Sequence, residues 1–238
     1  MGGYNARRMI NLFVPKETGA GETRVAVTPE SAKAFIKGGI SVSVERGAGE
    51  SAFMADSEYT AAGATIADRA AGFAAADIVA AVGAPPASDV AHMKAGSILI
   101  AMRAESSTNI TTLSMERIPR TTKAQTMDAL SSQASIAGYR AALIAATELP
   151  RYFPLLMTAA GTIKPAKVVV MGAGVAGLQA LATARRLGAV VEVSDIRPAV
   201  KEQVQSLGGR FIDLPMQESG EGAGGYAKEV SADFLRQQ

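Results

Sequence analysis

The 238-residue sequence contains no cysteine and a single histidine, His92. The absence of cysteine excludes disulfides, thiolate chemistry and cysteine metal sites, and one histidine leaves few ways to bind zinc. A lone histidine in a helical turn is more often a surface or packing residue than a catalytic one. We therefore expect no metal site in this chain.

Long apolar runs and a strong charge of either sign are also missing. No apolar stretch reaches the roughly 18 to 20 residues that span a bilayer, and the N-terminal segment lacks the apolar core and cleavage site of a secretory signal. The net charge is +2, without a run of Lys or Arg, whereas nucleic-acid surfaces depend on clustered positive charge. We expect a soluble, intracellular chain that neither inserts into a membrane nor binds nucleic acid.

Apolar residues make up 48% of the chain and aromatic residues only 5%, which favours helices packed closely on a sheet over an all-β sandwich. Short apolar runs alternate with helical patterns, as in an α/β fold with a mainly parallel sheet. Thr28 and Pro29 are typical of an N-cap and a first helical position, and predict a helix over residues 29–37. The predicted strands of the first half are residues 10–14, 41–45, 77–82 and 97–101.

The second half of the sequence repeats this α/β pattern. An Ala-rich helical pattern over residues 133–147 is apolar on more than one side, which predicts a helix buried between two lobes. We place the lobe boundary within this helix and assign residues 1–140 and 141–238 to the two lobes. The second lobe is predicted to contain strands at residues 167–171, 190–194 and 210–212, with helices at 175–187 and 199–207.

The second lobe has fewer strands than a complete nucleotide-binding domain. Such a domain usually has about six strands, and only about three are predicted here. The fold class is therefore α/β with two Rossmann-like lobes and mainly parallel sheets, the second lobe being incomplete. We expect the residues after about 213, including the flexible glycine-rich stretch 220–225, to be poorly packed.

Residues 172–177, with the sequence GAGVAG, fit the G-x-G-x-x-G pattern of dinucleotide-binding loops. The pattern follows a predicted strand and opens a predicted helix, which is the context it requires. The first glycine permits a tight turn, the second lets the backbone approach a pyrophosphate, and the third lets the helix pack on the strand. The helix N-terminus offers free N–H groups to the phosphates. The predicted nucleotide contacts are Gly172, Gly174, Val175, Ala176 and Gly177.

Asp195 ends the strand that follows the glycine loop. A carboxylate at this position can accept hydrogen bonds from the adenosine ribose and repels a 2′-phosphate, so it favours NAD over NADP. Arg197, two residues further on, keeps NADP binding open as an alternative. The structural alternative is an ordinary βαβ turn with incidental glycines and a capping Asp195.

Two polar segments of the first lobe are consistent with either a structural or a functional role. Residues 15–24 follow the first strand, where Glu22 and Arg24 form either a solvated ion pair, worth under about 1 kcal/mol, or a portion of a ligand site at a strand end. Residues 120–133 concentrate polar side chains before the long helix. Asp128 or Ser131 could simply cap that helix.

Longer motifs in these segments resemble a known family. Residues 15–17 (PKE) and 22–29 (ETRVAVTP) are similar to the opening of the alanine dehydrogenase and transhydrogenase superfamily. Residues 124–133 (AQTMDALSSQ), 137–140 (AGYR) and 158–162 (TAAGT) resemble the transhydrogenase branch more closely.

The resemblance implies an NAD(H)-binding component with the nucleotide in the cleft between its two lobes. The family's arginine-glutamine-aspartate loop falls on Arg120, Gln125 and Asp128, with Ser131 beside it, and these groups would contact the nicotinamide and its ribose. The catalytic residues implied are therefore Arg120, Gln125 and Asp128. The family's mobile loop matches Gly225 and Tyr226, and Gln238 is similar to a further nucleotide contact.

The resemblance also implies an activity and partners. NADH bound here would pass hydride to NADP(H) held on a partner component, and a membrane-spanning component would couple the transfer to proton translocation. The family suggests a homodimer. The implied location is cytoplasmic and peripheral to the inner membrane, through the partner.

Two other functions remain as alternatives. An amino-acid dehydrogenase of the alanine type needs a proton acceptor, and that enzyme has a Lys before Glu-Pro and a His after a later strand. The matching residues 80–85 and 98–102 supply neither. Hydride transfer between two nicotinamide rings moves no proton within this component, which suits a site poor in acid-base residues. The remaining alternative is a non-catalytic nucleotide-binding fragment.

Overall fold

The computed structural model describes residues 9–105, 108–119 and 121–213. The chain divides by its internal contacts into two compact units, Met1–Met127 and Asp128–Gln238. This division falls at the start of the long helix, whereas the boundary predicted from the sequence lies inside it, at residue 140. The tail expected to be poorly packed, with residues 220–225, lies outside the described residues.

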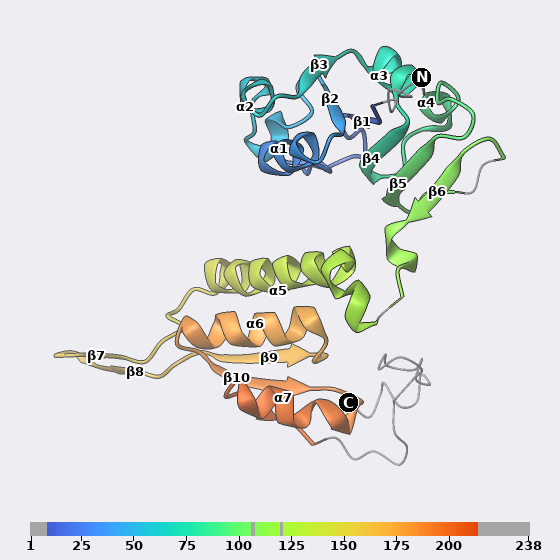
Figure 1. Ribbon diagram of the computed structural model, residues 1–238. Helices are drawn as coiled ribbons and strands as arrows, with labels where there is room; N and C mark the ends of the chain where they lie inside the picture. The colour runs from blue at the N-terminus through green and yellow to red at the C-terminus, as the bar shows by residue number, and fades with distance from the viewer. Residues whose placement is uncertain (1–8, 106–107, 120, 214–238) are drawn as a thin grey trace, which may run out of the picture. The chain divides into compact units, whose positions relative to one another are not determined.

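The first unit contains a parallel six-stranded sheet with the order β3-β2-β1-β4-β5-β6 (Figure 1). This is the doubly wound order, in which the chain direction across the sheet reverses between β1 and β4. The predicted α/β class and parallel pairing are therefore confirmed. The strands are β1 (Asn11–Val14), β2 (Ser41–Glu45), β3 (Thr65–Ala67), β4 (Ile78–Gly83), β5 (Ile98–Met102) and β6 (Thr111–Ser114).

Helices lie in the connections from β1 to β5, and the side chains of β1 enter two separate cores, with Leu12 and Val14 in one and Phe13 in the other, as expected for a parallel sheet that is buried on both faces. The Thr28 hydroxyl accepts a hydrogen bond from the Ser31 amide at 3.2 Å and Pro29 opens the helix, so the predicted N-cap is confirmed. On the sheet, Phe13 and Phe73 pack edge to face with ring centres 5.3 Å apart. The helices are α1 (Pro29–Lys37), α2 (Asp56–Ala61), α3 (Arg69–Ala75) and α4 (Ala87–Val90), with 3₁₀ turns η1 (Glu50–Ala52), η2 (Met115–Arg117) and η3 (Thr122–Met127).

The second unit contains a parallel three-stranded sheet with the order β11-β10-β9. Two of its strands, β9 (Lys167–Met171) and β10 (Val190–Ser194), have the predicted bounds. Among the described residues no strand pairs with the outer edge of β9, which fits the small number of strands predicted for this lobe. The other elements are α5 (Ala129–Glu148), α6 (Val175–Arg186), η4 (Pro198–Val200), α7 (Lys201–Ser206) and β11 (Arg210–Phe211).

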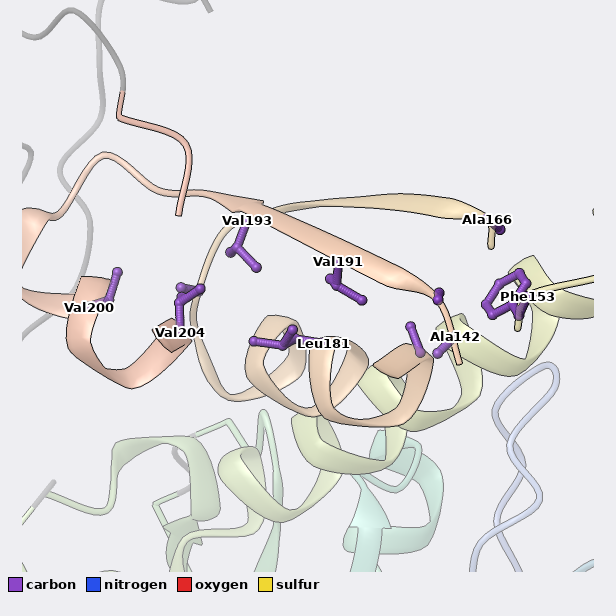
Figure 2. Close-up of a cluster of buried hydrophobic side chains, with 11 residues drawn as sticks. Ala142, Phe153, Ala166, Leu181, Val191, Val193, Val200 and Val204 are labelled. Atoms are coloured by element: carbon purple, nitrogen blue, oxygen red, sulfur yellow. The ribbon is translucent and has the colours of Figure 1, made fainter. Parts of the chain in front are cut away.

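The core of the second unit lies between its sheet and its helices. Leu181 of α6 is fully buried among Val191 and Val193 of β10 and Val204 of α7 (Figure 2). Along β10 every second side chain enters this core, as the pleat of a strand dictates. This arrangement fixes the positions at which β9 and β10 end, and those ends carry the glycine loop and Asp195.

Helix α5 forms an outer layer of the second unit and packs against α6 (Figure 1). It buries Gly138 and Ala142, whereas Ile136 and Tyr139 are exposed. Among the described residues of this unit, the helix is therefore covered on one side only.

A hairpin of β7 (Leu156–Thr158) and β8 (Gly161–Ile163) follows α5 and was not predicted from the sequence. Its two-residue turn, Ala159 and Ala160, lacks the Asn-Gly or Asp-Gly signature of such hairpins. The exposed fractions of Met157 and Leu155 are 73% and 55%, so the hairpin carries apolar surface away from the core of its unit.

Candidate nucleotide-binding site

The glycine loop lies where β9 ends and α6 begins. Gly172 has a φ of +98°, a left-handed conformation that L side chains rarely adopt. Its amide donates a hydrogen bond to the carbonyl oxygen of Ser194 at 2.7 Å. The chain thus turns sharply at the carboxyl end of β9 while it remains bonded to β10.

The first turn of α6 lies directly on this loop. A Cβ at Gly177 would overlap the carbonyl oxygen of Gly172, so only glycine permits this approach. At Gly174, the N-cap of α6, a Cβ would meet no atom within 4 Å. The free amides at the start of α6 and its positive dipole end therefore lie beside an open surface, to which an anion can bind.

Asp195 fastens the loop to the end of β10. Its Oδ2 accepts a hydrogen bond from the Ala173 amide at 2.6 Å and another from Arg197 Nη2 at 2.8 Å. Its Oδ1 accepts from the amide and Nε of Arg197, at 2.8 and 2.9 Å. The carboxylate thus joins the glycine loop, the end of β10 and a guanidinium.

The charge of Asp195 is balanced within this cluster, where its side chain is only 4% exposed and that of Arg197 only 15%. Burial alone would raise the pKa of Asp195, but the hydrogen bonds from Arg197 and Ala173 outweigh burial and lower it. The pKa of Asp195 is therefore lower in the folded than in the unfolded chain. The ionised carboxylate stabilises the folded state at pH values above its unfolded pKa of about 3.9, and this stabilisation is lost as the pH falls through the folded pKa. The carboxylate is therefore ionised at neutral pH.

Asp128 and Ser131 bond to each other at the start of α5. Asp128 is the N-cap: its Oδ1 accepts from the Ser131 amide at 2.9 Å, and its Oδ2 from the Ser131 hydroxyl at 2.7 Å. The capping interpretation of Asp128 is therefore confirmed, and the cap fixes the orientation of this carboxylate. A nucleotide contact by the same pair remains a prediction.

Helix α5 approaches the first turn of α6 at Gly138, which was not among the predicted site residues. A Cβ at Gly138 would overlap the backbone of Ala176, including its carbonyl oxygen. Close by, the Ser135 hydroxyl donates to Gln179 Oε1 at 3.4 Å. The signal was a glycine within a helix, which costs about 1 kcal/mol relative to Ala and so usually has a packing reason.

The other predicted contacts lie elsewhere in the chain. Gln125 is exposed on η3, in the first unit. The structure therefore brings together the glycine loop, Asp195 and Arg197 in one cluster, and Asp128 with Ser131 in another. Four predicted contacts lie outside the described residues: Arg120, Gly225, Tyr226 and Gln238.

The polar segment after β1 has structural partners. Both oxygens of the Glu17 carboxylate accept from β4, from the Val82 amide at 2.6 Å and the Gly83 amide at 3.1 Å. Glu22 and Arg24 form a 2.6 Å ion pair, and the hydrogen bonds from Arg24 lower the pKa of Glu22 to about 2. A small cavity of about 100 Å³ lies at this sheet edge.

None of the helices in the described ranges is long and apolar enough to cross a membrane. No group of three or more acidic or histidine side chains in those ranges is arranged to hold a metal ion. His92 Nδ1 lies 2.8 Å from the Ser88 carbonyl oxygen within the same turn.

The chain matches two family descriptions in succession. Residues 13–137 match "Alanine dehydrogenase/PNT, N-terminal domain", and residues 141–232 match "Alanine dehydrogenase/PNT, C-terminal domain". Together the two matches cover most of the sequence.

Several relatives are named as transhydrogenase subunits. The chain is 47% identical to an NAD(P) transhydrogenase subunit alpha polypeptide of Rhodospirillum rubrum, over 96% of this chain and 64% of that protein. It is 42% identical to NAD(P) transhydrogenase subunit alpha of Haemophilus influenzae, over 94% of this chain and 46% of that protein. The chain thus spans less than two thirds of the length of these relatives.

A solved structure and a further sequence relative also match the chain. A transhydrogenase from Sinorhizobium meliloti superimposes with a TM-score of 0.83 at 46% identity, over 88% of this chain and 63% of that one. Alanine dehydrogenase of Mycobacterium tuberculosis is more distant in sequence, with 33% identity over 79% of this chain and 54% of that protein. The chain therefore belongs to the alanine dehydrogenase/PNT family.

Proposed function

We propose that this chain binds NAD(H) at the glycine loop and serves as the NAD(H)-binding component of a proton-translocating transhydrogenase. The observation that carries the proposal is the loop at residues 172–177, which exposes the free amides of α6 and is held to β10 by Asp195. The names of the relatives in Rhodospirillum rubrum and Haemophilus influenzae support the transhydrogenase assignment.

The protein groups fit a dinucleotide. The amides of Val175 and Ala176 would donate to the pyrophosphate, and the open side of Gly174 leaves room for it. Bound NADH supplies the hydride, so the protein contributes positioning and exclusion of water. Gln125 and Asp128, together with Arg120, would orient the nicotinamide and its ribose.

Selectivity for NAD(H) over NADP(H) would come from Asp195. Its ionised carboxylate lies at the end of β10, where a ribose hydroxyl could share it with Arg197 and where a 2′-phosphate would be repelled. The guanidinium of Arg197 already pairs with this carboxylate. The positive charge of Arg197 is therefore compensated and attracts a 2′-phosphate less strongly. NADP(H) would be held by the partner component.

The partners would be an NADP(H)-binding and a membrane-spanning component, which would place this chain at the cytoplasmic face of the inner membrane. The chain itself would form a homodimer. The β7–β8 hairpin supports a dimer because it is uncharged over residues 156–163 and exposes Met157. An uncharged two-stranded edge can pair with its own copy about a two-fold axis without repulsion.

The first test is hydride transfer. With the NADP(H)-binding component added, we expect the chain to reduce an NADP analogue at the expense of NADH, followed by absorbance. Asp128→Asn should lower the rate by about tenfold, while the melting temperature changes little because Asn also caps helices well. Asp213→Asn, at an exposed site in the same unit, should leave the rate unchanged. A normal rate of hydride transfer in the Asp128→Asn variant would show that Asp128 serves only as the helix cap.

The second prediction concerns nucleotide selectivity. In fluorescence titrations NADH should bind at least about tenfold more tightly than NADPH, a difference of about 1.4 kcal/mol. Asp195→Ala should narrow this ratio, because it removes the repulsive charge and frees Arg197 for a 2′-phosphate. Asp213→Ala should leave the ratio as it is. Equal affinities in the unmodified chain would refute the assignment of Asp195.

The third prediction concerns Gly138. Gly138→Ala should push α5 away from Ala176 and weaken NADH binding, measured at a temperature where the variant is folded. Gly72→Ala is the matched control, because its Cβ would overlap the Phe13 ring in the first unit. Gly72→Ala should lower the melting temperature and leave the affinity for NADH unchanged. If both variants bind NADH equally well, Gly138 has a packing role only.

The fourth prediction separates the transhydrogenase from an alanine dehydrogenase. We expect no formation of NADH from NAD and alanine, because the stretches at residues 80–85 and 98–102 supply neither a Lys nor a His as proton acceptor. An assay of NADH absorbance would detect such turnover. Saturable activity with alanine would instead favour the dehydrogenase.

A further inference from the structure

The connection between β5 and β6 is unusually short for two parallel strands. It comprises residues 103–110, whereas parallel neighbours usually need a dozen or more residues and a helix. The connections before it in this sheet carry α1, α2, α3 and α4. Of the residues in this connection that the structure describes, 103–105 and 108–110, none is helical.

A hollow of about 520 Å³ lies beside this short connection. It lies within the first unit, between α4 and the end of β5, whose labels are seen in Figure 1. Eight of the eleven lining residues are apolar, Val90, Met93, Leu99 and Ile110 among them, and the other three are Arg103, Glu105 and Asn109. The volume falls within the range of about 300–1,000 Å³ that is typical of small-molecule sites.

Arg103 contributes a positive charge to the lining of the hollow. It follows β5 directly, and its φ of +56° is uncommon for a residue with a side chain. Its amide donates to Glu116 Oε2 at 2.9 Å, which helps to hold this conformation. Arg103 is one of the residues that line the hollow, and among the described residues its guanidinium has neither a hydrogen bond nor an ion pair. Strained backbone conformations of this kind cluster at functional sites.

We propose that this hollow binds a small apolar monocarboxylate, with the carboxylate on Arg103 and the hydrocarbon chain against the wall of Val90, Met93 and Leu99. A guanidinium recognises a planar carboxylate through two parallel hydrogen bonds. Glu105 also lines the hollow, and its negative charge repels phosphates and dicarboxylates, which carry two charges, more strongly than a monocarboxylate. The apolar wall selects a ligand with a chain of several carbons over acetate.

The hollow shares no lining residue with the proposed NAD(H) site. Every residue that lines the hollow belongs to the first unit, whereas the glycine loop and Asp195 belong to the second. Failure of one proposal therefore leaves the other untouched, and NADH titration of the same protein sample would show which of them had failed.

The test uses hexanoate as the probe, with binding followed by amide chemical shifts and by calorimetry. We expect saturable binding, with shifts at residues 90–93, 99 and 108–110 and at Arg103. Hexanol, which has the chain without the charge, and acetate, which has the charge without the chain, should each bind at least roughly tenfold more weakly. Equal binding of acetate and hexanoate, or no saturation with hexanoate, would overturn the proposal.

Arg103→Gly is the informative variant because glycine adopts a positive φ without strain, so the fold should be kept. It should weaken hexanoate binding roughly tenfold, and Arg103→Lys should weaken it less, since the charge remains but the planar fork is lost. Arg46→Ala, an exposed arginine of the same unit, is the control and should bind normally. Unchanged affinity in a folded Arg103→Gly variant would show that Arg103 does not hold the ligand.

Discussion

The hydrogen bond from the Ala173 amide to the Asp195 carboxylate is the contact on which the proposed site depends. It joins the loop between β9 and α6 to the end of β10. One hydrogen bond therefore holds the ends of two strands and the N-terminus of α6 together. The anchor is ionic, because Arg197 keeps the carboxylate charged in a buried position. In the function proposed above, the same carboxylate would also face the ribose, which would couple the geometry of the loop to nucleotide selectivity.

Helix α5 extends this anchored region. Gly138 permits backbone contact between α5 and the first turn of α6, and Asp128 caps the start of α5. A polar residue with a structural partner can therefore also be a functional one, because the cap fixes the direction of the carboxylate. In the first unit the Glu17 carboxylate also has a fixed direction, because it accepts hydrogen bonds from two backbone amides of β4.

The sequence alone predicts the parts of the structure that depend on residues close together in the chain. The strand, glycine loop and helix from residue 167 onward carry an apolar run, a glycine pattern and a carboxylate at fixed spacing, and β9 and β10 have their predicted bounds. The β7–β8 hairpin could not be predicted, since its turn lacks a signature. The pairing of Asp195 with Ala173, the approach of Gly138 to Ala176 and the strained Arg103 depend on contacts between distant residues, which spacing does not reveal.

The central claim is that NAD(H) binds at residues 172–177 and at the end of β10. The most direct measurement is a titration of the chain with NADH, followed by backbone amide chemical shifts. The account predicts that the largest saturable shifts fall on Gly172, Ala173, Gly174 and the first turn of α6, with further shifts at Asp195 and Arg197. Saturable shifts confined to the first unit, with the amides of the glycine loop unaffected, would contradict it.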